Sequence, residues 1–327
     1  MGLLVNGNWQ NQWYDTKASQ GEFVREDSKF HNKVVPTPSS PDEFQAEPDR
    51  YHLFVSLACP WAHRTLIMRK LKKLEAIISV TSVKADMMEF GWEFESGDSS
   101  LNELNLDYRY LHQVYAASKP DYTGRVTVPV LWDKANRVIV NNESSQIIRF
   151  FNKSFDEFTP MHYDFYPEDK QTEIDEINDL VYHNINNGVY KCGFATTQEA
   201  YEKAFDNLFA ALDTLEIKLE SQRFLVGSSI SEADWRLFTT LVRFDPVYFT
   251  HFKANKKRIA DYPNLFNYLK ELYQVPGVRE TVNMEHIKRH YYYSHETINP
   301  KRIVPKGPLV DLDGPHDRNR FSENPIL

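Results

Sequence analysis

The sequence predicts an α/β domain followed by an all-α domain. Strand-like runs rich in β-branched and aromatic residues occur between about residues 51 and 141, and they fade after about residue 165. From there on, apolar residues recur at helical spacing in one stretch after another. A chain of 327 residues is too long for one compact helical bundle and comfortable for two domains.

The α/β part begins with a βαβ unit. Residues 51–56 (YHLFVS) read as a short strand, AHRTLIMRKLKKL has apolar residues at helical spacing, and residues 77–83 read as a second strand. Such crossovers are almost always right-handed. After a long polar and aromatic insertion over residues 85–122, with a helix in DYRYLHQVYAAS, we expect strands in VTVPVLWD and RVIV and a helix in NNESSQIIRFFN. The order βαβ, insertion, ββα is the thioredoxin arrangement.

The second half predicts helices and little else. Ser231 and Asp234 form a capping-box pattern at the start of one of them. We expect helices over residues 168–187, 197–221, 231–243, 263–274 and 281–291. The predicted organisation is an irregular N-terminal extension over residues 1–48, a thioredoxin-like domain over 49–158, a helical domain over 165–300 and an irregular tail over 301–327. Within the extension, the Pro/Ser-rich run 36–41 predicts a linker or surface loop.

Composition narrows the class of protein. The net charge of −8 argues against a nucleic-acid binder, which normally has a basic face. Only two cysteines, Cys59 and Cys192, are present, whereas a secreted protein of this size tends to use more, in pairs. The first residues lack the basic and apolar regions of a signal peptide, and no stretch approaches 18 uninterrupted apolar residues. We therefore expect a soluble cytoplasmic protein with reduced thiols and no membrane span.

Cys59 is the sharpest chemical feature. It lies between a predicted strand and a predicted helix and is followed by Pro60, which suits the first helical position. Unpaired N–H groups and the dipole at a helix start favour a thiolate and lower a thiol pKa. The alternative is a buried structural cysteine without reactivity. Ala62 stands where a dithiol enzyme has its second cysteine, so an external thiol, in the cytosol usually glutathione, has to regenerate the site.

Three other features are candidates for binding glutathione. Val128-Pro129 opens a strand and is a candidate cis peptide that would turn the Val128 backbone toward Cys59, although an ordinary trans proline is equally open. Ser144 and Glu143 precede a helix, so they would suit the carboxylate and ammonium groups of a γ-glutamyl end; Ser144 as a plain N-cap is the alternative. Arg125 and Trp92 are candidates for the other end of the tripeptide.

The remaining candidates are aromatic residues and a histidine. His63, four residues after Cys59, lies on the same helix face and either polarises the thiol or simply packs. The C-terminal half is rich in tyrosines, which either stack on an aromatic substrate or pack between helices; they include Tyr190, Tyr248 and Tyr291 to Tyr293. Cys192 has no motif around it and is predicted to be structural. Metal and phosphate motifs are absent from the sequence.

Several of these segments match one known family. Along nearly its whole length the chain resembles the glutathionyl-hydroquinone reductases, also called Xi-class glutathione transferases. The matching stretches are WYDTK, DRYHLFVSLACPWAHRTLIMRKLK, GRVTVPVLWDK, NNESSQIIR, NNGVYKCGFAT, LVRFDPVYFTHFK and HETINP. The CPWAHRT and VRFDPVY segments separate this group from the Omega-class transferases, which share the single cysteine.

The resemblance implies a fold, a reaction and a set of residues. The fold would be that of glutathione transferases, with the thioredoxin-like domain binding glutathione as co-substrate, no permanent cofactor and a homodimer formed through the helical domain. Cys59 would attack the sulfur of a glutathionyl-hydroquinone, and a second glutathione would release oxidised glutathione. The implied glutathione site is Trp92, Arg125, Val126, Val128, Glu143 and Ser144. The implied aromatic-substrate residues are Tyr190, Tyr248 and Tyr291, with Tyr190 and Tyr291 also catalytic; Tyr291 is chosen over its two neighbours because it follows His290.

Two other functions remain open at this point. An Omega-type thioltransferase or dehydroascorbate reductase would use the same Cys59 chemistry with a different occupant of the aromatic pocket. A binding or scaffold protein that has lost turnover is the third possibility, and the intact Cys59 argues against it. A conventional transferase fits less well, since a cysteine at this position would form a disulfide with glutathione. The sequence does not name the physiological hydroquinone.

Overall fold

A computed structural model of the protein describes residues 2–321, which form two compact units. Unit 1 contains the residues up to Trp13 together with Glu26–Tyr163 and Thr281–His290. Unit 2 contains Tyr14–Arg25, Asp164–Glu280 and the residues from Tyr291 onward. Each unit is therefore assembled from three separate stretches of the chain, and the domain boundaries expected at residues 48, 158, 165 and 300 stay a prediction.

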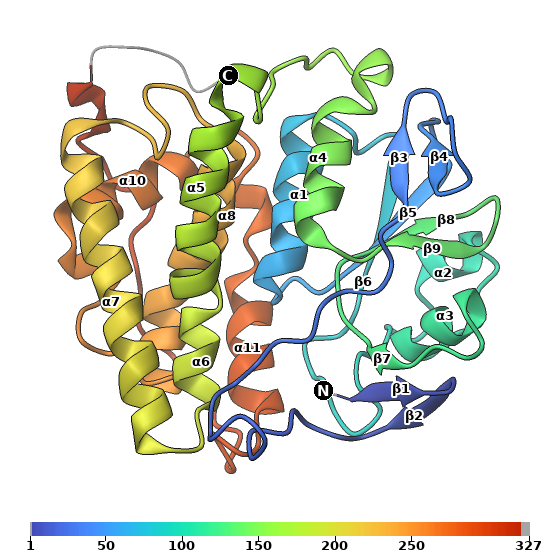
Figure 1. The fold of residues 1–327 in the computed structure, drawn as a ribbon, viewed down its shortest axis with the longest axis horizontal. Helices are drawn as coiled ribbons and strands as arrows, with labels where there is room; N and C mark the ends of the chain where they lie inside the picture. Colours follow the sequence, from blue (N-terminus) through green and yellow to red (C-terminus); the bar gives the residue numbers. More distant parts are fainter. Residues whose placement is uncertain (1, 322–327) are drawn as a thin grey trace. The chain divides into compact units, whose positions relative to one another are not determined.

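A four-stranded sheet in the order β6-β5-β8-β9 forms the core of unit 1 (Figure 1). Its strands are β5 (Tyr51–Val55), β6 (Ile78–Ser82), β8 (Val130–Asp133) and β9 (Val138–Asn141). The pair β5 and β6 is parallel, whereas β8 runs antiparallel to both β5 and β9. Every residue of β5 is buried, as expected for a strand covered on both faces. The predicted succession of βαβ and two further strands is confirmed.

Helices cover both faces of this sheet (Figure 1). On one side α1 (Pro60–Leu71) and α4 (Ser144–Lys153) pack against each other, and on the other lie α2 (Ser99–Glu103) and α3 (Leu111–Ser118). Helix α1 begins at Pro60 because proline lacks an N–H and the first position of a helix does not use one. The arrangement confirms the α/β fold predicted for the N-terminal half.

The strand predicted in VTVPVLWD begins later than expected. Gly124–Arg125 forms β7, which pairs with the N-terminal extension instead of the main sheet. The Tyr115 hydroxyl donates to the Thr127 carbonyl at 2.8 Å and holds the segment that follows. Pro129 has no N–H to give to a ladder, so β8 starts only at Val130.

The N-terminal extension is more ordered than the sequence predicts. It contains four short strands, β1 (Leu3–Val5), β2 (Asn8–Gln10), β3 (Lys33–Val35) and β4 (Glu43–Gln45). β1 lies between β2 and β7, and β3 pairs with β4. Three-residue strands are too short to show alternation in a sequence, which explains why they were not expected. The run 36–41 connects β3 to β4 and is largely exposed, as predicted for a surface loop.

Unit 2 is helical, as predicted. Its helices are α5 (Gln171–Val181), α6 (Gly188–Phe194), α7 (Gln198–Ser221), α8 (Glu232–Arg243), α9 (Phe249–His251) and α10 (Pro263–Tyr273). The last helix, α11 (Met284–Ser294), contributes its residues up to His290 to unit 1 and the rest to unit 2. The capping box of Ser231 and Asp234 is present at the start of α8.

Two helices of unit 2 were not predicted, α6 and the three-residue α9. Helix α6 carries glycine at two positions, which lowers the helix propensity of its sequence. Gly193 is required by packing, since a Cβ built there would lie 2.3 Å from ring atoms of Phe252. The packing of unit 2 therefore overrides the local preference of this segment.

The C-terminal tail is irregular as predicted, but one of its side chains is fully buried. The Arg318 guanidinium donates to the carbonyl oxygens of Leu219, Gln222 and Arg223 at 2.7–2.8 Å. These are carbonyls at the end of α7, where a cation is favourable. Among residues 2–321, no helix has both the length and the apolar character needed to cross a membrane.

Candidate active site

Cys59 is the N-cap residue of α1, where the sequence placed it. Its backbone is extended, with φ −74° and ψ 121°, and Pro60 follows as the first helical residue. The side chain is partly exposed and is not part of a disulfide. The Sγ atom lies 3.4 Å from the Val128 carbonyl oxygen, to which the thiol donates. The first turn of α1 has no acidic residue, so nothing in that turn opposes a thiolate.

The Val128-Pro129 peptide bond is cis, one of the two alternatives left open by the sequence. Val128 and Val126 are both buried, with 4% and 2% of their surface exposed. The backbone of this segment is therefore next to Cys59, as the hydrogen bond from the thiol to Val128 shows.

Glu143 and Ser144 lie at the start of α4, but their positions differ from the alternative in which Ser144 is a plain N-cap. The N-cap is Glu143, whose Oε1 accepts hydrogen bonds from the Ser145 backbone N–H at 2.9 Å and from the Ser145 hydroxyl at 2.8 Å. The interpretation of Ser144 as a plain N-cap is wrong, since it is the first residue of the helix. The second carboxylate oxygen of Glu143 accepts from the Ser28 hydroxyl at 3.1 Å.

Two neighbours of this helix start were not found from the sequence. Arg64 of α1 is buried, with its Nη1 3.4 Å from the Ser144 hydroxyl and its guanidinium 4.6 Å from the ring centre of Trp61. Ser28 comes from the N-terminal extension, 115 residues before Glu143. Arg64 lies in the CPWAHRT segment, which gives no sign of its contact with Ser144, and Ser28 lies in no motif, so only the folded chain reveals these contacts.

Arg125 is held by the N-terminal extension. Its Nε donates to the Glu26 carboxylate at 2.8 Å, and its two other nitrogens donate to the backbone carbonyls of Gln12 and Trp13. The residue is 8% exposed. The guanidinium thus has three acceptors from the chain itself, which the sequence did not indicate.

Trp92 is buried, and its one polar side-chain atom has no hydrogen-bond partner among residues 2–321. It is 4% exposed, and its indole N–H is buried and donates to no acceptor among residues 2–321. Its ring stacks on the imidazole of His290, with ring centres 4.9 Å apart and planes at 24°. A buried donor without an acceptor is uncommon in folded proteins, and it fits a site for a ligand's oxygen.

The three predicted aromatic-site tyrosines come together within unit 2. The Tyr291 hydroxyl lies 2.5 Å from that of Tyr190 and 3.1 Å from that of Tyr248. Burial, followed by the neighbouring Tyr190 and Tyr248, raises the pKa of Tyr291 well above its usual value, so the phenol stays protonated. Arg25, whose guanidinium lies 4.9 Å from the ring centre of Tyr190, was not among the residues that the sequence predicted for this site.

The neighbours of Tyr291 make other contacts. The Tyr292 hydroxyl donates to the Pro246 carbonyl at 3.1 Å, and the Tyr293 ring lies 5.2 Å from the Arg302 guanidinium. Of the three consecutive tyrosines, Tyr291 is therefore the one that joins Tyr190 and Tyr248.

His63 and Cys192 are both buried. The His63 ring is buried and its Nε2 lies 2.8 Å from the Thr281 hydroxyl. Cys192 is buried, and burial raises the pKa of its thiol to about 12, which suits the structural role predicted for it. Among residues 2–321, no three His, Cys, Asp or Glu side chains gather to hold a metal ion.

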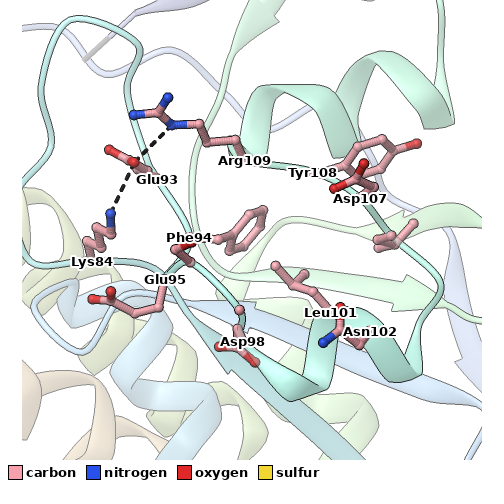
Figure 2. A pocket seen from close by; sticks show the side chains of 13 residues that line it. Lys84, Glu93, Phe94, Glu95, Asp98, Leu101, Asn102, Asp107, Tyr108 and Arg109 are labelled. Carbon is pink, nitrogen blue, oxygen red and sulfur yellow. Dashed lines mark hydrogen bonds and ion pairs between the residues drawn. The ribbon is translucent and has the colours of Figure 1, made fainter.

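Unit 1 also contains a cavity of about 420 Å³ that the sequence did not indicate (Figure 2). Glu93 at its edge pairs with Lys84 and Arg109, both at 3.0 Å, as the dashed lines in Figure 2 show. None of the predicted site residues lines this cavity. Both basic residues of its lining, Lys84 and Arg109, are paired with Glu93, so neither of them indicates a ligand.

Family models of known proteins match both halves of the chain. The family model for the glutathione S-transferase N-terminal domain matches residues 58–154, and the model for the C-terminal domain matches residues 198–271. Both halves of the predicted architecture are thereby confirmed.

Similar proteins cover nearly the whole chain. The glutathionyl-hydroquinone reductase YqjG of Escherichia coli is 53% identical over 98% of this chain and 99% of its own, and PcpF of Sphingobium chlorophenolicum is 52% identical over 96% and 98%. The glutathione-bound structure of YqjG superposes with a TM-score of 0.88 over 98% of this chain and 100% of that one, at 49% identity. A Xi-class transferase structure from Natrialba magadii gives a TM-score of 0.92 at 47% identity, over 98% of both chains.

Proposed function

Because the chain belongs to the glutathionyl-hydroquinone reductases, the Xi class of glutathione transferases, we propose that it reduces glutathionyl-hydroquinones to hydroquinones with glutathione. The single observation that carries the proposal is Cys59, a partly exposed thiol at the N-cap of α1. A helix start stabilises a thiolate, and the thiolate is the nucleophile.

In the first step, the Cys59 thiolate attacks the glutathionyl sulfur. A bond between the two sulfurs forms, and the bond between the glutathionyl sulfur and the aromatic carbon breaks. The carbon keeps the electron pair and takes a proton, so the hydroquinone leaves in reduced form. Cys59 and glutathione remain as a mixed disulfide.

In the second step, the thiolate of another glutathione attacks the glutathionyl sulfur of this mixed disulfide. Oxidised glutathione leaves, and Cys59 returns as a thiolate. The reductant is thus glutathione itself, and the chemistry needs no permanent cofactor. Ala62, in place of a second cysteine, fits this requirement for an external thiol.

We assign the glutathione site to unit 1. The Val128 backbone pairs with the peptide of glutathione, while Glu143 and Ser144 at the start of α4 hold the ammonium and carboxylate groups of its γ-glutamyl end. Trp92 offers its indole N–H to the other end. Arg125 and Val126 act through their backbone, since the Arg125 guanidinium already donates to the N-terminal extension.

We assign the aromatic ring of the substrate to Tyr190, Tyr248 and Tyr291. Departure of the hydroquinone requires a proton at the ring carbon, and a phenol with a raised pKa remains a donor at neutral pH. Tyr190 and Tyr291, joined by a 2.5 Å hydrogen bond, are the proposed proton donors. The Tyr248 hydroxyl is also bonded to that of Tyr291, and we assign the Tyr248 ring to contact with the aromatic ring of the substrate.

We also propose a cytoplasmic homodimer formed through the helical half. A glutathione-dependent monothiol enzyme depends on the reduced glutathione pool of the cytoplasm. Sedimentation equilibrium of the full chain tests the assembly, and a monomer at micromolar concentration would contradict it.

The decisive experiment compares the wild type with Cys59→Ser and Cys192→Ser. Each is given glutathione and either a glutathionyl-hydroquinone or a small mixed disulfide. We expect the wild type and Cys192→Ser to release hydroquinone, and Cys59→Ser to release none and to carry no glutathione adduct by intact mass.

Two outcomes would contradict the proposal. Release of hydroquinone by Cys59→Ser at the wild-type rate would remove Cys59 from the mechanism. Fast turnover of the mixed disulfide without turnover of the glutathionyl-hydroquinone would instead indicate an Omega-type thioltransferase.

A further inference from the structure

The middle of α11 is hydrogen-bonded to the loop that carries Trp92, although the two lie about 200 residues apart in the chain. Arg289 forms two hydrogen bonds with the Asp86 carboxylate, at 2.7 and 2.8 Å. The next residue, His290, places its Nδ1 2.9 Å from the Ala85 carbonyl oxygen. Two consecutive residues of the helix thus bind two consecutive residues of the loop.

The imidazole of His290 stacks on the Trp92 ring. The two rings stack with centres 4.9 Å apart, and His290 and Trp92 are 6% and 4% exposed. Burial lowers the pKa of His290 to about 3, so the ring is neutral near pH 7. Because a carbonyl oxygen only accepts hydrogen bonds, Nδ1 carries the proton, and this bond fixes both the tautomer and the ring plane.

Trp92 presents a donor that the protein does not satisfy. Its indole N–H is buried and has no acceptor among residues 2–321. A buried donor without an acceptor has lost its hydrogen bond to water and gained none in return, which destabilises the protein. In the orientation that it has beside the stacked histidine, the indole N–H forms a hydrogen bond only when an oxygen atom of a ligand accepts from it.

We propose that His290 is a positioning residue for glutathione, acting through the plane of Trp92. The Ala85 carbonyl orients His290, His290 orients Trp92, and the indole N–H donates to a carboxylate or carbonyl oxygen of glutathione. This inference rests on the proposed function only in taking glutathione as the ligand of Trp92. His290 itself takes no part in bond making or breaking.

A double-mutant cycle tests this chain of contacts. Binding of S-methylglutathione, a thioether that cannot react with Cys59, is measured by calorimetry on the full chain. The variants are Trp92→Phe, His290→Ala, the double variant and His290→Phe, which keeps a flat ring. Glu285→Ala, an exposed change on the same helix, is the matched control.

We expect Trp92→Phe and His290→Ala each to weaken binding about tenfold, since one hydrogen bond to a charged group is involved. The double variant should bind no more weakly than Trp92→Phe alone, because His290 acts only through Trp92. His290→Phe should stay within about threefold of the wild type, as should Glu285→Ala. In turnover, His290→Ala should raise the KM for glutathione more than it lowers kcat.

Three results would overturn the inference: no change in His290→Ala, losses that simply add in the double variant, or the same loss in His290→Phe as in His290→Ala. If His290→Ala does not fold, His290→Leu, which fills the space without a flat ring, replaces it in the cycle with the same expected loss of about tenfold. Failure of the wild type to bind S-methylglutathione would overturn the proposed function as well. Normal binding and turnover with an unaffected His290→Ala would overturn only the role of His290.

Discussion

His290 and Tyr291 are consecutive residues of α11, and their side chains belong to different groups of residues. His290 stacks on Trp92, whereas the Tyr291 hydroxyl is bonded to those of Tyr190 and Tyr248. Successive side chains on an α-helix point in directions about 100° apart, so neighbours in the chain are free to serve different partners. One short segment of α11 therefore supports both the proposed glutathione residue and the proposed aromatic-site residues.

Tyr291→Phe should slow turnover strongly with little effect on glutathione. The change removes the hydroxyl that joins Tyr190 and Tyr248 and leaves the ring in place. We expect kcat with a glutathionyl-hydroquinone to fall about 100-fold, the lower range for loss of a general acid, while the KM for glutathione stays within about twofold.

The adjacent Tyr292→Phe is the matched control for this prediction. It loses one buried hydrogen bond, to the Pro246 carbonyl, and should keep kcat within about threefold of the wild type. Equal losses in both variants would show that the tyrosines matter for packing alone.

Arg125→Ala should loosen the N-terminal extension. The guanidinium joins Glu26 to the carbonyls of Gln12 and Trp13, and a hydrogen bond to a charged group contributes about 2 kcal/mol. We expect a loss of about 2 kcal/mol in the free energy of unfolding by urea and faster cleavage between residues 12 and 26 in limited proteolysis.

Arg109→Ala is the comparison, since Arg109 is 70% exposed and its loss should leave the midpoint of urea unfolding nearly unchanged. Weaker S-methylglutathione binding in Arg125→Ala, with unchanged proteolysis, would instead assign the guanidinium to glutathione.

His52 should make unit 1 sensitive to acid. The ring is fully buried on β5, with Nδ1 2.7 Å from the Ser79 hydroxyl and Nε2 2.9 Å from the Thr81 hydroxyl. Burial lowers its pKa to about 3, so below pH 6.5 the unfolded chain binds a proton that the folded chain does not. Stability therefore falls as the pH falls from about 6.5 toward 3.

His52 alone should lower the free energy of unfolding by about 2 kcal/mol between pH 7 and about pH 5. Urea unfolding of the wild type and of His52→Asn at both pH values measures this. The variant should be less stable at pH 7 but lose about 2 kcal/mol less on acidification. The same loss in both proteins would contradict a depressed pKa at His52.

The parts of the fold that the sequence predicts are those with a local signal. Cys59 followed by Pro60 marks a helix start within a few residues, and Ser231 with Asp234 marks another. The βαβ unit and most helices are likewise legible from their periodicity. The short strands of the extension and the glycine-bearing α6 carry no such signal, because pairing and packing with distant residues create them.

The predicted site is limited in the same way. Residue type and position single out Cys59 and Glu143. They do not reveal that the Glu26 carboxylate, 99 residues away, accepts a hydrogen bond from the Arg125 guanidinium. Nor do they reveal that His290 lies on Trp92. Contacts between distant segments produce no pattern in the sequence of either segment. A motif therefore identifies a functional residue but not the residues that contact it.

The chain changes unit at Tyr14, Glu26, Asp164, Thr281 and Tyr291. A chimaera of two relatives joined once, near residue 163, would therefore mix both parents inside each unit. Shuffling the glutathione-binding half of one enzyme onto the helical half of another requires all three stretches of a unit to be exchanged together. We therefore expect the substrate range of this protein to be easier to alter by point substitutions than by exchanging halves of the gene.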